Sequence, residues 1–166
     1  MLKQFYPASR KESTYEIPFE ELYRQGIRGV IFDVDNTLVP HDAPADTRAK
    51  ELFKRLREIG LESCLASNNK EPRVKKFARA VGTKYIYKAG KPKRRGYKEA
   101  MKQMGTRAEN TVFVGDQIFT DIWGANRAGI TSILVKPINP KEEIQIVIKR
   151  VPEKLVLYFY ERTIEK

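Results

Sequence analysis

The sequence has few of the residues that several functional classes require. Its 166 residues include one cysteine and one histidine. A single cysteine cannot form an internal disulfide, which excludes a secreted scaffold held by disulfides. One histidine and one cysteine cannot complete a zinc site of the Cys₂His₂ or His₃ type. No apolar run reaches the ~18–20 residues that span a bilayer, and the N-terminus lacks the apolar stretch of a signal peptide. We therefore expect a soluble, cytoplasmic protein.

The positive charge is unevenly distributed along the chain. There are 32 lysines and arginines against 21 aspartates and glutamates, a net charge of +11. Eleven of these basic residues, with one acid, lie in residues 70–95, which we call the basic segment. Such a segment is either a solvated face or a site that attracts a polyanion, such as phosphate groups, nucleic acid or an anionic membrane.

Short apolar runs alternate with amphipathic helical windows along residues 28–136. This strict alternation predicts a doubly wound α/β fold with a mainly parallel, Rossmann-like sheet. Asp46 and Gly60 have the residue types that begin and end a helix. The length suits a single domain over 1–166. The expected strands are 30–32, 63–66, 85–87, 111–114 and 133–135, and the expected helices are 46–59, 72–81, 93–104 and 120–128.

The C-terminal tail, residues 141–166, has a mixed pattern. Ile144, Ile146 and Ile148 alternate as in a strand. After Pro152 the apolar residues follow a helical spacing, at Leu155, Val156, Phe159 and Tyr160. We expect the tail to pack on the core. Contact with a membrane surface or with a partner is the alternative.

Polar side chains follow the expected strands, where ligands bind in sheets of this kind. Asp33 and Asp35 follow the first strand, Ser67 the second and Asp116 the fourth, and Lys91 comes shortly after the third. A carboxylate can attack phosphorus, and a second carboxyl group can protonate the leaving oxygen. Crowded carboxylates and a phosphate need a hard cation, usually Mg²⁺, and an ammonium group shares the remaining negative charge. These residues predict a phosphoryl-transfer site.

Four motifs resemble those of the haloacid dehalogenase (HAD) superfamily, and they stand in the order of that family. Asp33-Val34-Asp35-Asn36-Thr37-Leu38 resembles the first motif, DxDxT, and Ser67 followed by Asn68-Asn69 resembles the second. Lys91-Pro92 resembles the third motif, and Gly115-Asp116 with Asp121 resembles the fourth. Nearly the whole chain is similar to the small YqeG-type branch of HAD subclass IIIA. Relatives in that branch include phosphatidylglycerophosphate phosphatases.

The resemblance implies a role for each catalytic residue. Asp33 is implied to be the nucleophile and a metal ligand. Asp35 is implied to be the general acid and base, with its backbone carbonyl also on the metal. Ser67 is implied to hydrogen-bond a phosphoryl oxygen and Lys91 to stabilise the developing charge. Lys88 and Lys93 are rivals for the last role, but Pro92 favours Lys91.

The metal implied is Mg²⁺, with Asp116 as the main ligand of the fourth motif. Asp121 is implied to be a ligand through water or an outer support, and a helix cap is the competing interpretation. We expect further residues to lie at the substrate, namely Asn36, Thr37, Asn68, Arg73, Arg94 and Arg95. Asn36 and Thr37 are also expected to stabilise the turn that carries Asp35. The other cations of the basic segment are expected to surround the mouth of the site.

Larger HAD enzymes insert a cap domain between motifs, and the intervals here leave no room for one. Ser67 follows Asp33 by 34 positions and Lys91 follows Ser67 by 24. An open site fits a bulky substrate. We therefore expect a Mg²⁺-dependent phosphomonoester hydrolase with an aspartyl-phosphate intermediate. Its expected substrate is membrane-borne, such as phosphatidylglycerophosphate, reached peripherally at the inner face of the membrane.

Two alternatives stay open from the sequence. One is a phosphatase of the same superfamily that acts on polynucleotide ends or on proteins. The other is a basic nucleic-acid-binding domain with an idle site. A signalling receiver domain also uses Mg²⁺ and a phosphorylated aspartate, but it places that aspartate after the third strand, which the order of residues here disfavours.

Overall fold

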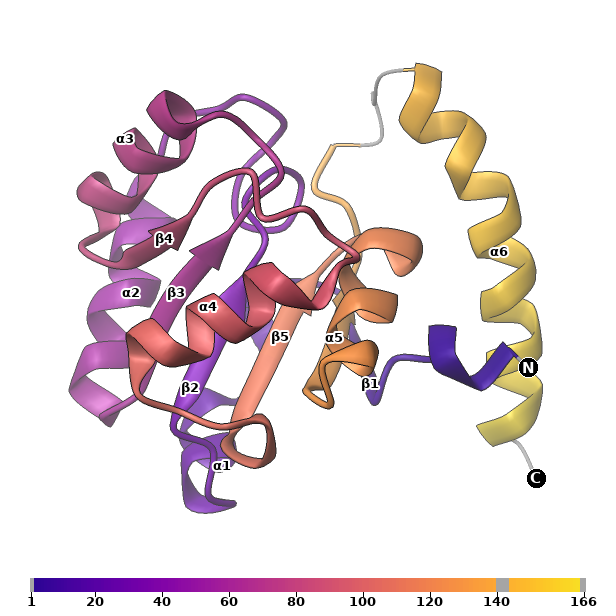
Figure 1. The fold of residues 1–166 in the computed structure, drawn as a ribbon, viewed down its shortest axis with the longest axis horizontal. Helices are drawn as coiled ribbons and strands as arrows, with labels where there is room; N and C mark the ends of the chain where they lie inside the picture. The colour runs from indigo at the N-terminus through magenta and orange to yellow at the C-terminus, as the bar shows by residue number, and fades with distance from the viewer. Residues whose placement is uncertain (1, 140–143, 165–166) are drawn as a thin grey trace.

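The protein is built around one six-stranded, all-parallel sheet (Figure 1). The structure, a computed structural model, describes residues 2–139 and 144–164, with side chains of the last helix described from Arg150 onward. The strand order is β1-β6-β5-β2-β3-β4. This confirms the expected doubly wound fold. The strands are β1 (Ser9–Lys11), β2 (Gly29–Phe32), β3 (Glu62–Ala66), β4 (Lys84–Ile86), β5 (Thr111–Gly115) and β6 (Thr131–Val135).

Helices follow the strands and return the chain to the start of the next one. In α2, the Asp46 side chain accepts a hydrogen bond from the backbone N–H of Ala49 at 2.8 Å, and the helix ends at Gly60 with φ +97°. Both ends therefore lie where the sequence predicts them. The helices are α1 (Phe19–Arg24), α2 (Thr47–Ile59), α3 (Glu71–Val81), α4 (Arg94–Met104), α5 (Trp123–Arg127) and α6 (Ile144–Ile164), with a 3₁₀ turn η1 (Leu2–Phe5) and a π-helical turn η4 (Ile118–Ile122).

The two faces of the sheet are covered by different helices, because successive side chains of a strand point to opposite faces. Val30 and Phe32 of β2 pack into one apolar cluster with residues of α2 and α3. Ile31, between them, packs into a second cluster with Tyr97 and Met101 of α4. The four residues of β2 are all buried, as expected for a central parallel strand.

The order of the strands creates a switch point between β2 and β5. From β2 the chain continues to β3 and β4 on one side, and it then crosses to β5 and β6 on the other. Loops that follow β2 and β5 therefore diverge and leave a crevice at the carboxyl edge of the sheet. Asp33 and Asp116 are the first residues after these two strands.

No cap domain interrupts this core. Between β2 and β3 the structure holds a loop and α2, and between β3 and Lys91 it holds α3 and β4. The capless architecture expected from the motif intervals is thereby confirmed. Within residues 2–139 and 144–164, no helix combines the length and the apolar character needed to cross a bilayer.

Two segments differ from the sequence-based expectation. The strand-like alternation at Ile144–Ile148 was misleading, because α6 is helical from Ile144 and continues through Pro152 to Ile164. The expected helix 120–128 begins earlier, as the turn η4, and becomes α-helical at Trp123. Residues 141–143 and 165–166 of the tail lie outside the described residues.

We had expected the cations of the basic segment to surround the mouth of the site. Only some of them lie there. Lys93 is the N-cap of α4, which begins at the carboxyl edge of the sheet. Arg79 lies in the last turn of α3, and Lys84 begins β4 and pairs with Glu62, the first residue of β3. These last two cations therefore lie at the opposite, amino edge, because α3 runs antiparallel to the strands.

Candidate active site

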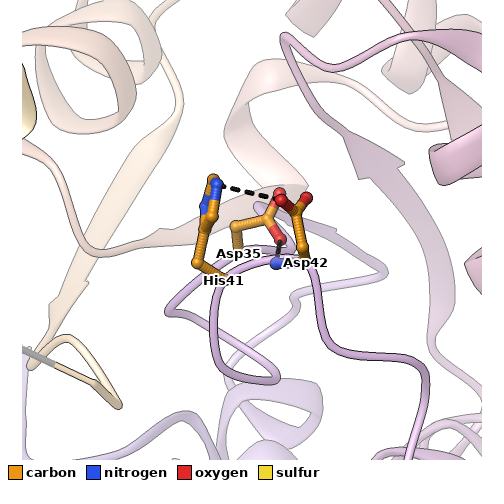
Figure 2. A group of neighbouring side chains, drawn as sticks. All are labelled: Asp35, His41 and Asp42. Atoms are coloured by element: carbon orange, nitrogen blue, oxygen red, sulfur yellow. Dashed lines mark hydrogen bonds and ion pairs between the residues drawn. The ribbon is translucent and has the colours of Figure 1, made fainter. Parts of the chain in front are cut away.

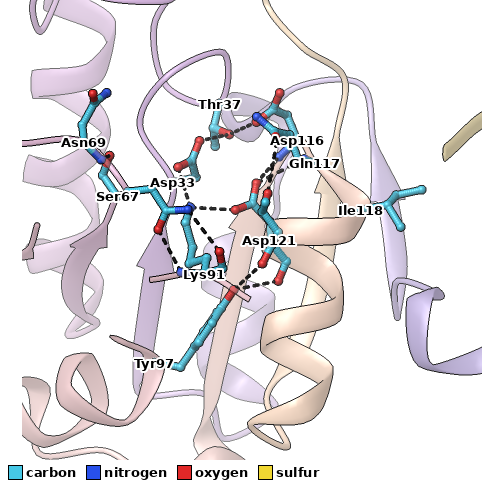
Figure 3. Close-up of polar contacts among 12 residues, drawn as sticks. Asp33, Thr37, Ser67, Asn69, Lys91, Tyr97, Asp116, Gln117, Ile118 and Asp121 are labelled. Carbon is cyan, nitrogen blue, oxygen red and sulfur yellow. Dashed lines mark hydrogen bonds and ion pairs between the residues drawn. The ribbon is translucent and has the colours of Figure 1, made fainter. Parts of the chain in front are cut away.

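The carboxyl ends of β2, β3 and β5 bring together side chains that are far apart in the sequence (Figure 3). Asp33, Ser67 and Asp116 each follow a buried strand, and their side chains are themselves buried. Burying carboxylates in this way is costly unless partners compensate their charge. The surroundings of each carboxylate therefore indicate what the site does.

Lys91 connects two of the carboxylates. Its ammonium nitrogen lies 2.6 Å from Asp33 Oδ1 and 2.6 Å from Asp121 Oδ1, and its side chain is only 3% exposed. Burial opposes its charge, but Asp121 and Asp33 outweigh burial and raise the pKa of Lys91. The ammonium group is therefore charged. Lys88 and Lys93, its rivals in the sequence, are exposed.

Asn68 fixes the backbone that carries Lys91. Its side-chain carbonyl accepts a hydrogen bond from the Lys91 N–H at 2.8 Å, and its amide donates to the Lys91 carbonyl at 3.2 Å. This double contact joins the loop after β3 to the loop after β4. The structure therefore shows Asn68 positioning Lys91, and its expected contact with the substrate stays a prediction.

Asp116 is held between Thr37 and Arg150. The Thr37 hydroxyl lies 3.1 Å from Asp116 Oδ1 and 3.3 Å from Asp33 Oδ2. Arg150, from α6, donates to Asp116 Oδ2 at 2.7 Å and to the Asp116 carbonyl at 2.7 Å. Arg150 also donates to Glu153 at 2.9 Å, and Glu153 in turn accepts from the Ile118 N–H at 2.8 Å.

Asp121 has both carboxylate oxygens engaged. Oδ1 accepts from Lys91, and Oδ2 accepts from the backbone N–H groups of Asp116 and Gln117 at 3.2 and 3.1 Å. Tyr97 donates its hydroxyl to the carbonyls of Thr120 and Asp121, at 2.8 and 3.1 Å, and so holds the turn η4 against α4. This geometry fits the outer-support role for Asp121 better than a helix cap.

The carboxylate of Asp35 lies in a different set of contacts from that of Asp33. Asp35 Oδ2 accepts from the Asn69 amide at 2.7 Å, and Oδ1 accepts from Arg73 at 2.9 Å and from the backbone N–H of Asp42 at 2.9 Å. Figure 2 shows it beside His41 and Asp42, with His41 Nε2 3.3 Å from a carboxylate oxygen of Asp42. Asn69 also donates its N–H to the Ser67 hydroxyl at 3.1 Å.

The remaining residues expected at the substrate have different positions. Asn36 has φ +62° and accepts from the backbone N–H of Asn139 at 3.2 Å, so it stabilises a turn and a neighbouring loop. Arg73 reaches the site, where its Nε is buried and has no hydrogen-bond partner within the described chain. Arg94 and Arg95 are exposed at the start of α4, at the rim of the crevice.

Burial and mutual repulsion make the cluster electrostatically unfavourable on its own. Burial raises the pKa of Asp33 to about 7, against the attraction of Lys91, and the charge of Asp121 adds to the increase. Burial also raises the pKa of Asp116 well above its usual range, with repulsion from Asp33 and Asp121. Lys91 and Arg150 supply two positive charges to these three carboxylates, and Arg150 is shared with Glu153. The carboxylates therefore outnumber the cations, and a bound cation would favour their charged forms.

The donor set suits a hard divalent cation. Asp33, Asp116 and Asp121 each offer a carboxylate oxygen, and these three atoms lie within 4.8 Å of one another. Oxygen ligands without sulfur or imidazole are those that hard divalent cations prefer. The side chain of Asp35 is not in this group, and its expected part in metal binding rests on its backbone carbonyl alone.

Sequence reasoning missed several residues of the site. Arg150 and Glu153 lie 34 and 37 positions beyond Asp116 in the sequence, in a segment with no motif. Nothing in their local pattern shows that α6 returns to the carboxyl edge. Asn69 was also missed as a partner of Asp35, and Tyr97 was missed as a partner of η4. Asn69 had a signal, since it stands in the second motif directly after Asn68.

A crevice with paired carboxylates and a lysine at a parallel-sheet switch point defines a phosphoryl-transfer type of site, and comparison with known proteins agrees. A family model described as haloacid dehalogenase-like hydrolase matches residues 41–129. The chain belongs to this family. Phosphatases of the superfamily generally use a divalent metal, which agrees with the acidic cluster.

Individual relatives give the comparison more detail. The probable phosphatase YqeG of Bacillus subtilis (strain 168) is 37% identical over 159 residues, which cover 95% of this chain and 92% of the relative. The chloroplastic/mitochondrial phosphatidylglycerophosphate phosphatase 1 of Arabidopsis thaliana is 30% identical over 162 residues. That match covers 90% of this chain but 45% of the relative, so the chain spans less than half of the plant protein.

A solved structure shares the fold. The cobalt-bound deoxy-D-mannose-octulosonate 8-phosphate phosphatase of Haemophilus influenzae superposes with a TM-score of 0.55 at 20% identity, covering 67% of this chain and 69% of that one. The expected superfamily and the likeness to the YqeG-type branch are thus confirmed. The protein is an enzyme of the HAD phosphatase type.

Proposed function

We propose that the protein is a Mg²⁺-dependent phosphomonoesterase that works through an aspartyl-phosphate on Asp33 and acts on a lipid phosphate. The observation that carries the chemistry is the contact of Lys91 with both Asp33 and Asp121, at 2.6 Å each. It places a fixed positive charge against the carboxylate that attacks phosphorus. Mg²⁺ held by Asp33 and Asp116 would neutralise charge on the phosphate and the carboxylates.

The reaction then proceeds in two displacements. The Asp33 carboxylate attacks phosphorus, the ester P–O bond breaks, and Asp35 donates a proton to the leaving oxygen. Water next attacks the phosphoryl group on Asp33 while Asp35 takes up its proton, which releases inorganic phosphate. Asn69 and Arg73 hold the Asp35 carboxylate in place.

The substrate class rests on two observations. Within the described residues no cap domain stands between the motifs, which favours a substrate whose phosphate is presented at the surface of a large assembly. The phosphatidylglycerophosphate phosphatase named above is similar to 90% of this chain. A lipid phosphate such as phosphatidylglycerophosphate at the inner face of a membrane is therefore the substrate we propose.

The test is phosphate release from a panel of substrates with and without Mg²⁺. The panel contains phosphatidylglycerophosphate in vesicles, 3′- and 5′-phosphorylated oligonucleotides, phosphopeptides and sugar phosphates. Asp33→Asn is expected to abolish turnover. Lys91→Gln is expected to lower kcat by about 10²–10³-fold, as for loss of one positioned charge-stabilising group. Lys93→Gln, an exposed neighbour, serves as the matched control and is expected to leave kcat unchanged.

The outcomes separate the candidates. Faster turnover of the oligonucleotides or phosphopeptides than of the lipid would favour a phosphatase for those substrates. No turnover of any ester, with salt-sensitive binding of nucleic acid, would favour a nucleic-acid-binding domain with an idle site.

A further inference from the structure

The outward face of α6 carries an apolar stripe that no described part of the chain covers. Val151, Leu155, Tyr158 and Phe159 are 70%, 59%, 47% and 42% exposed. Three of them, Val151, Leu155 and Tyr158, recur at the spacing of one helical face, and Phe159 lies beside Leu155. Only Leu2, Tyr87 and Ile164 are comparably exposed large apolar side chains elsewhere in the described residues. The stripe is therefore a concentrated feature rather than scattered exposure.

The opposite face of α6 contacts the core at several points, and beside these contacts Lys154, Leu157 and Glu161 line a pocket between α6 and strands β1 and β6. Val156 and Tyr160 are 5% and 9% exposed, and Tyr160 packs edge-to-face on Tyr6 at 5.3 Å between ring centroids. Glu153 accepts a hydrogen bond from the Ile118 N–H at 2.8 Å, and Glu161 forms an ion pair with Arg10. These contacts fix which face of α6 points toward the core, and the exposed stripe lies on the other face.

Most charged side chains of α6 lie beside the stripe rather than in it. Over residues 150–164, Glu153 pairs with Arg150, and Glu161, which pairs with Arg10, shares a helical face with Lys154 seven positions earlier. Arg162 lies over the ring of Tyr158 at 4.6 Å on the outward face. An apolar stripe with aromatic rings and a cation has the composition of a surface that meets a membrane interface.

We propose that this outward face of α6 is the surface through which the protein docks on an anionic lipid bilayer. A second copy of the chain fits less well. A two-fold contact sets a patch against itself, which would bring Arg162 near its own counterpart in a protein of net charge +11. An anionic bilayer buries the same apolar side chains and pairs Arg162 with a lipid phosphate.

The docking surface lies close to the site. Val151 directly follows Arg150, whose guanidinium bonds Asp116, and the first half of α6 lies near the carboxyl edge of the sheet (Figure 1). A bilayer on the outward face would therefore lie across α6 from Asp116, at the same end of the molecule as the carboxyl edge. The inference rests on the proposed function, since it names the surface by which a lipid substrate is reached.

Binding to vesicles tests the surface without any turnover. Wild-type protein is expected to co-sediment with vesicles of equal phosphatidylglycerol and phosphatidylcholine, and far less with phosphatidylcholine alone. Leu155→Ser/Phe159→Ser is expected to lower the bound-to-free ratio at least tenfold. Tyr87→Ser, an exposed apolar side chain away from α6, is the matched control and is expected to bind as wild type. Hydrolysis of a soluble ester is expected to be the same for all these proteins.

Three results would overturn the docking surface. They are a wild type that does not bind anionic vesicles, a double variant that binds as well as wild type, and a dimer in solution that the double variant dissociates. If the proposed phosphatase function is wrong, the result is different: the protein fails to hydrolyse soluble esters but still binds vesicles.

Discussion

At the scale of single residues, two cations, Lys91 and Arg150, compensate the buried carboxylates of the site. Lys91 is the one cation buried among the described residues, and it serves Asp33 and Asp121 together. Arg150 compensates Asp116 from the other side. Because each cation has specific carboxylate partners, the loss of either leaves a buried charge without compensation, which is more damaging than the loss of an exposed ion pair.

Burial acts differently on the single cysteine, because the opposing charge of Lys84 is the weaker effect there. Cys64 lies on β3 with an exposed fraction of 0%, and burial raises the pKa of its thiol to about 12. The thiolate is the reactive form, so at pH 8 the native thiol is ionised in only about one molecule in ten thousand, against about a quarter for a free cysteine. We expect the native protein to resist a thiol-specific reagent at pH 8. The rate is expected to keep rising with pH through pH 9 without a plateau.

The control for this prediction is the same reagent in denaturant, where one thiol per chain is expected to react at the rate of a free cysteine. A native rate equal to the denatured rate, or a plateau near pH 8.5, would show that Cys64 is accessible in the folded protein.

At the scale of elements, α6 is the helix that the motifs do not include and the site nevertheless uses. Arg150→Ala removes the partner of Asp116 and of Glu153 at once. Truncating one member of a buried ion pair costs about 3–5 kcal/mol, and the 18% exposure of the Arg150 side chain places the expected loss near the lower end. For a domain of this size that corresponds to a decrease in Tm of about 6–12 °C, measured by calorimetry or circular dichroism.

Arg162→Ala provides the matched control on the same helix. Its guanidinium lies over the exposed ring of Tyr158, so its removal is expected to change stability by about 0.5 kcal/mol or less. Equal decreases in Tm for the two variants would contradict the view that Arg150 attaches α6 to the catalytic edge.

The elements also show what can be predicted from the sequence. Strands β2 to β6 follow from compact apolar runs, and the ends of α2 follow from Asp46 and Gly60, because these signals are local. Strand β1 was missed, since its three residues Ser9–Lys11 are polar and only partly covered at the edge of the sheet. The strand-like alternation at 144–148 pointed to the wrong element, because short apolar patterns of this kind occur in helices as well as in strands.

Inside the site, too, positions that follow from local sequence signals were predicted, and contacts that depend on long-range packing were not. Asp33, Lys91, Asp116 and Asp121 were placed together correctly because each stands at a strand end or a motif position, and parallel strands bring those ends together. The contacts of Arg150, Tyr97 and Asn68 depend on side-chain directions and on helices that return from elsewhere. No spacing in the sequence encodes these directions, so three-dimensional packing was needed to find them.

At the scale of the whole molecule, the basic segment is divided between the two edges of the sheet. Arg94 and Arg95 lie at the carboxyl edge beside the site, whereas Arg79 and Lys84 lie at the amino edge. Only the first pair is positioned to attract an anionic surface toward Asp33. A basic residue near an anionic membrane contributes about 1 kcal/mol, a factor of about five, and this attraction is screened within about 8–10 Å at physiological salt.

Comparison of two charge-matched variants tests this division. Arg94→Gln/Arg95→Gln is expected to lower kcat/KM for phosphatidylglycerophosphate in anionic vesicles by about tenfold or more at low salt, and by much less at 0.5 M salt. Arg79→Gln/Lys84→Gln removes the same charge from the amino edge and is expected to leave that value nearly unchanged. Hydrolysis of a small soluble ester is expected to respond little to either variant, because screening and distance weaken the effect on a substrate that carries few charges. If both variants lower kcat/KM equally on vesicles, the effect is one of net charge, and the carboxyl edge has no special part in attracting the substrate.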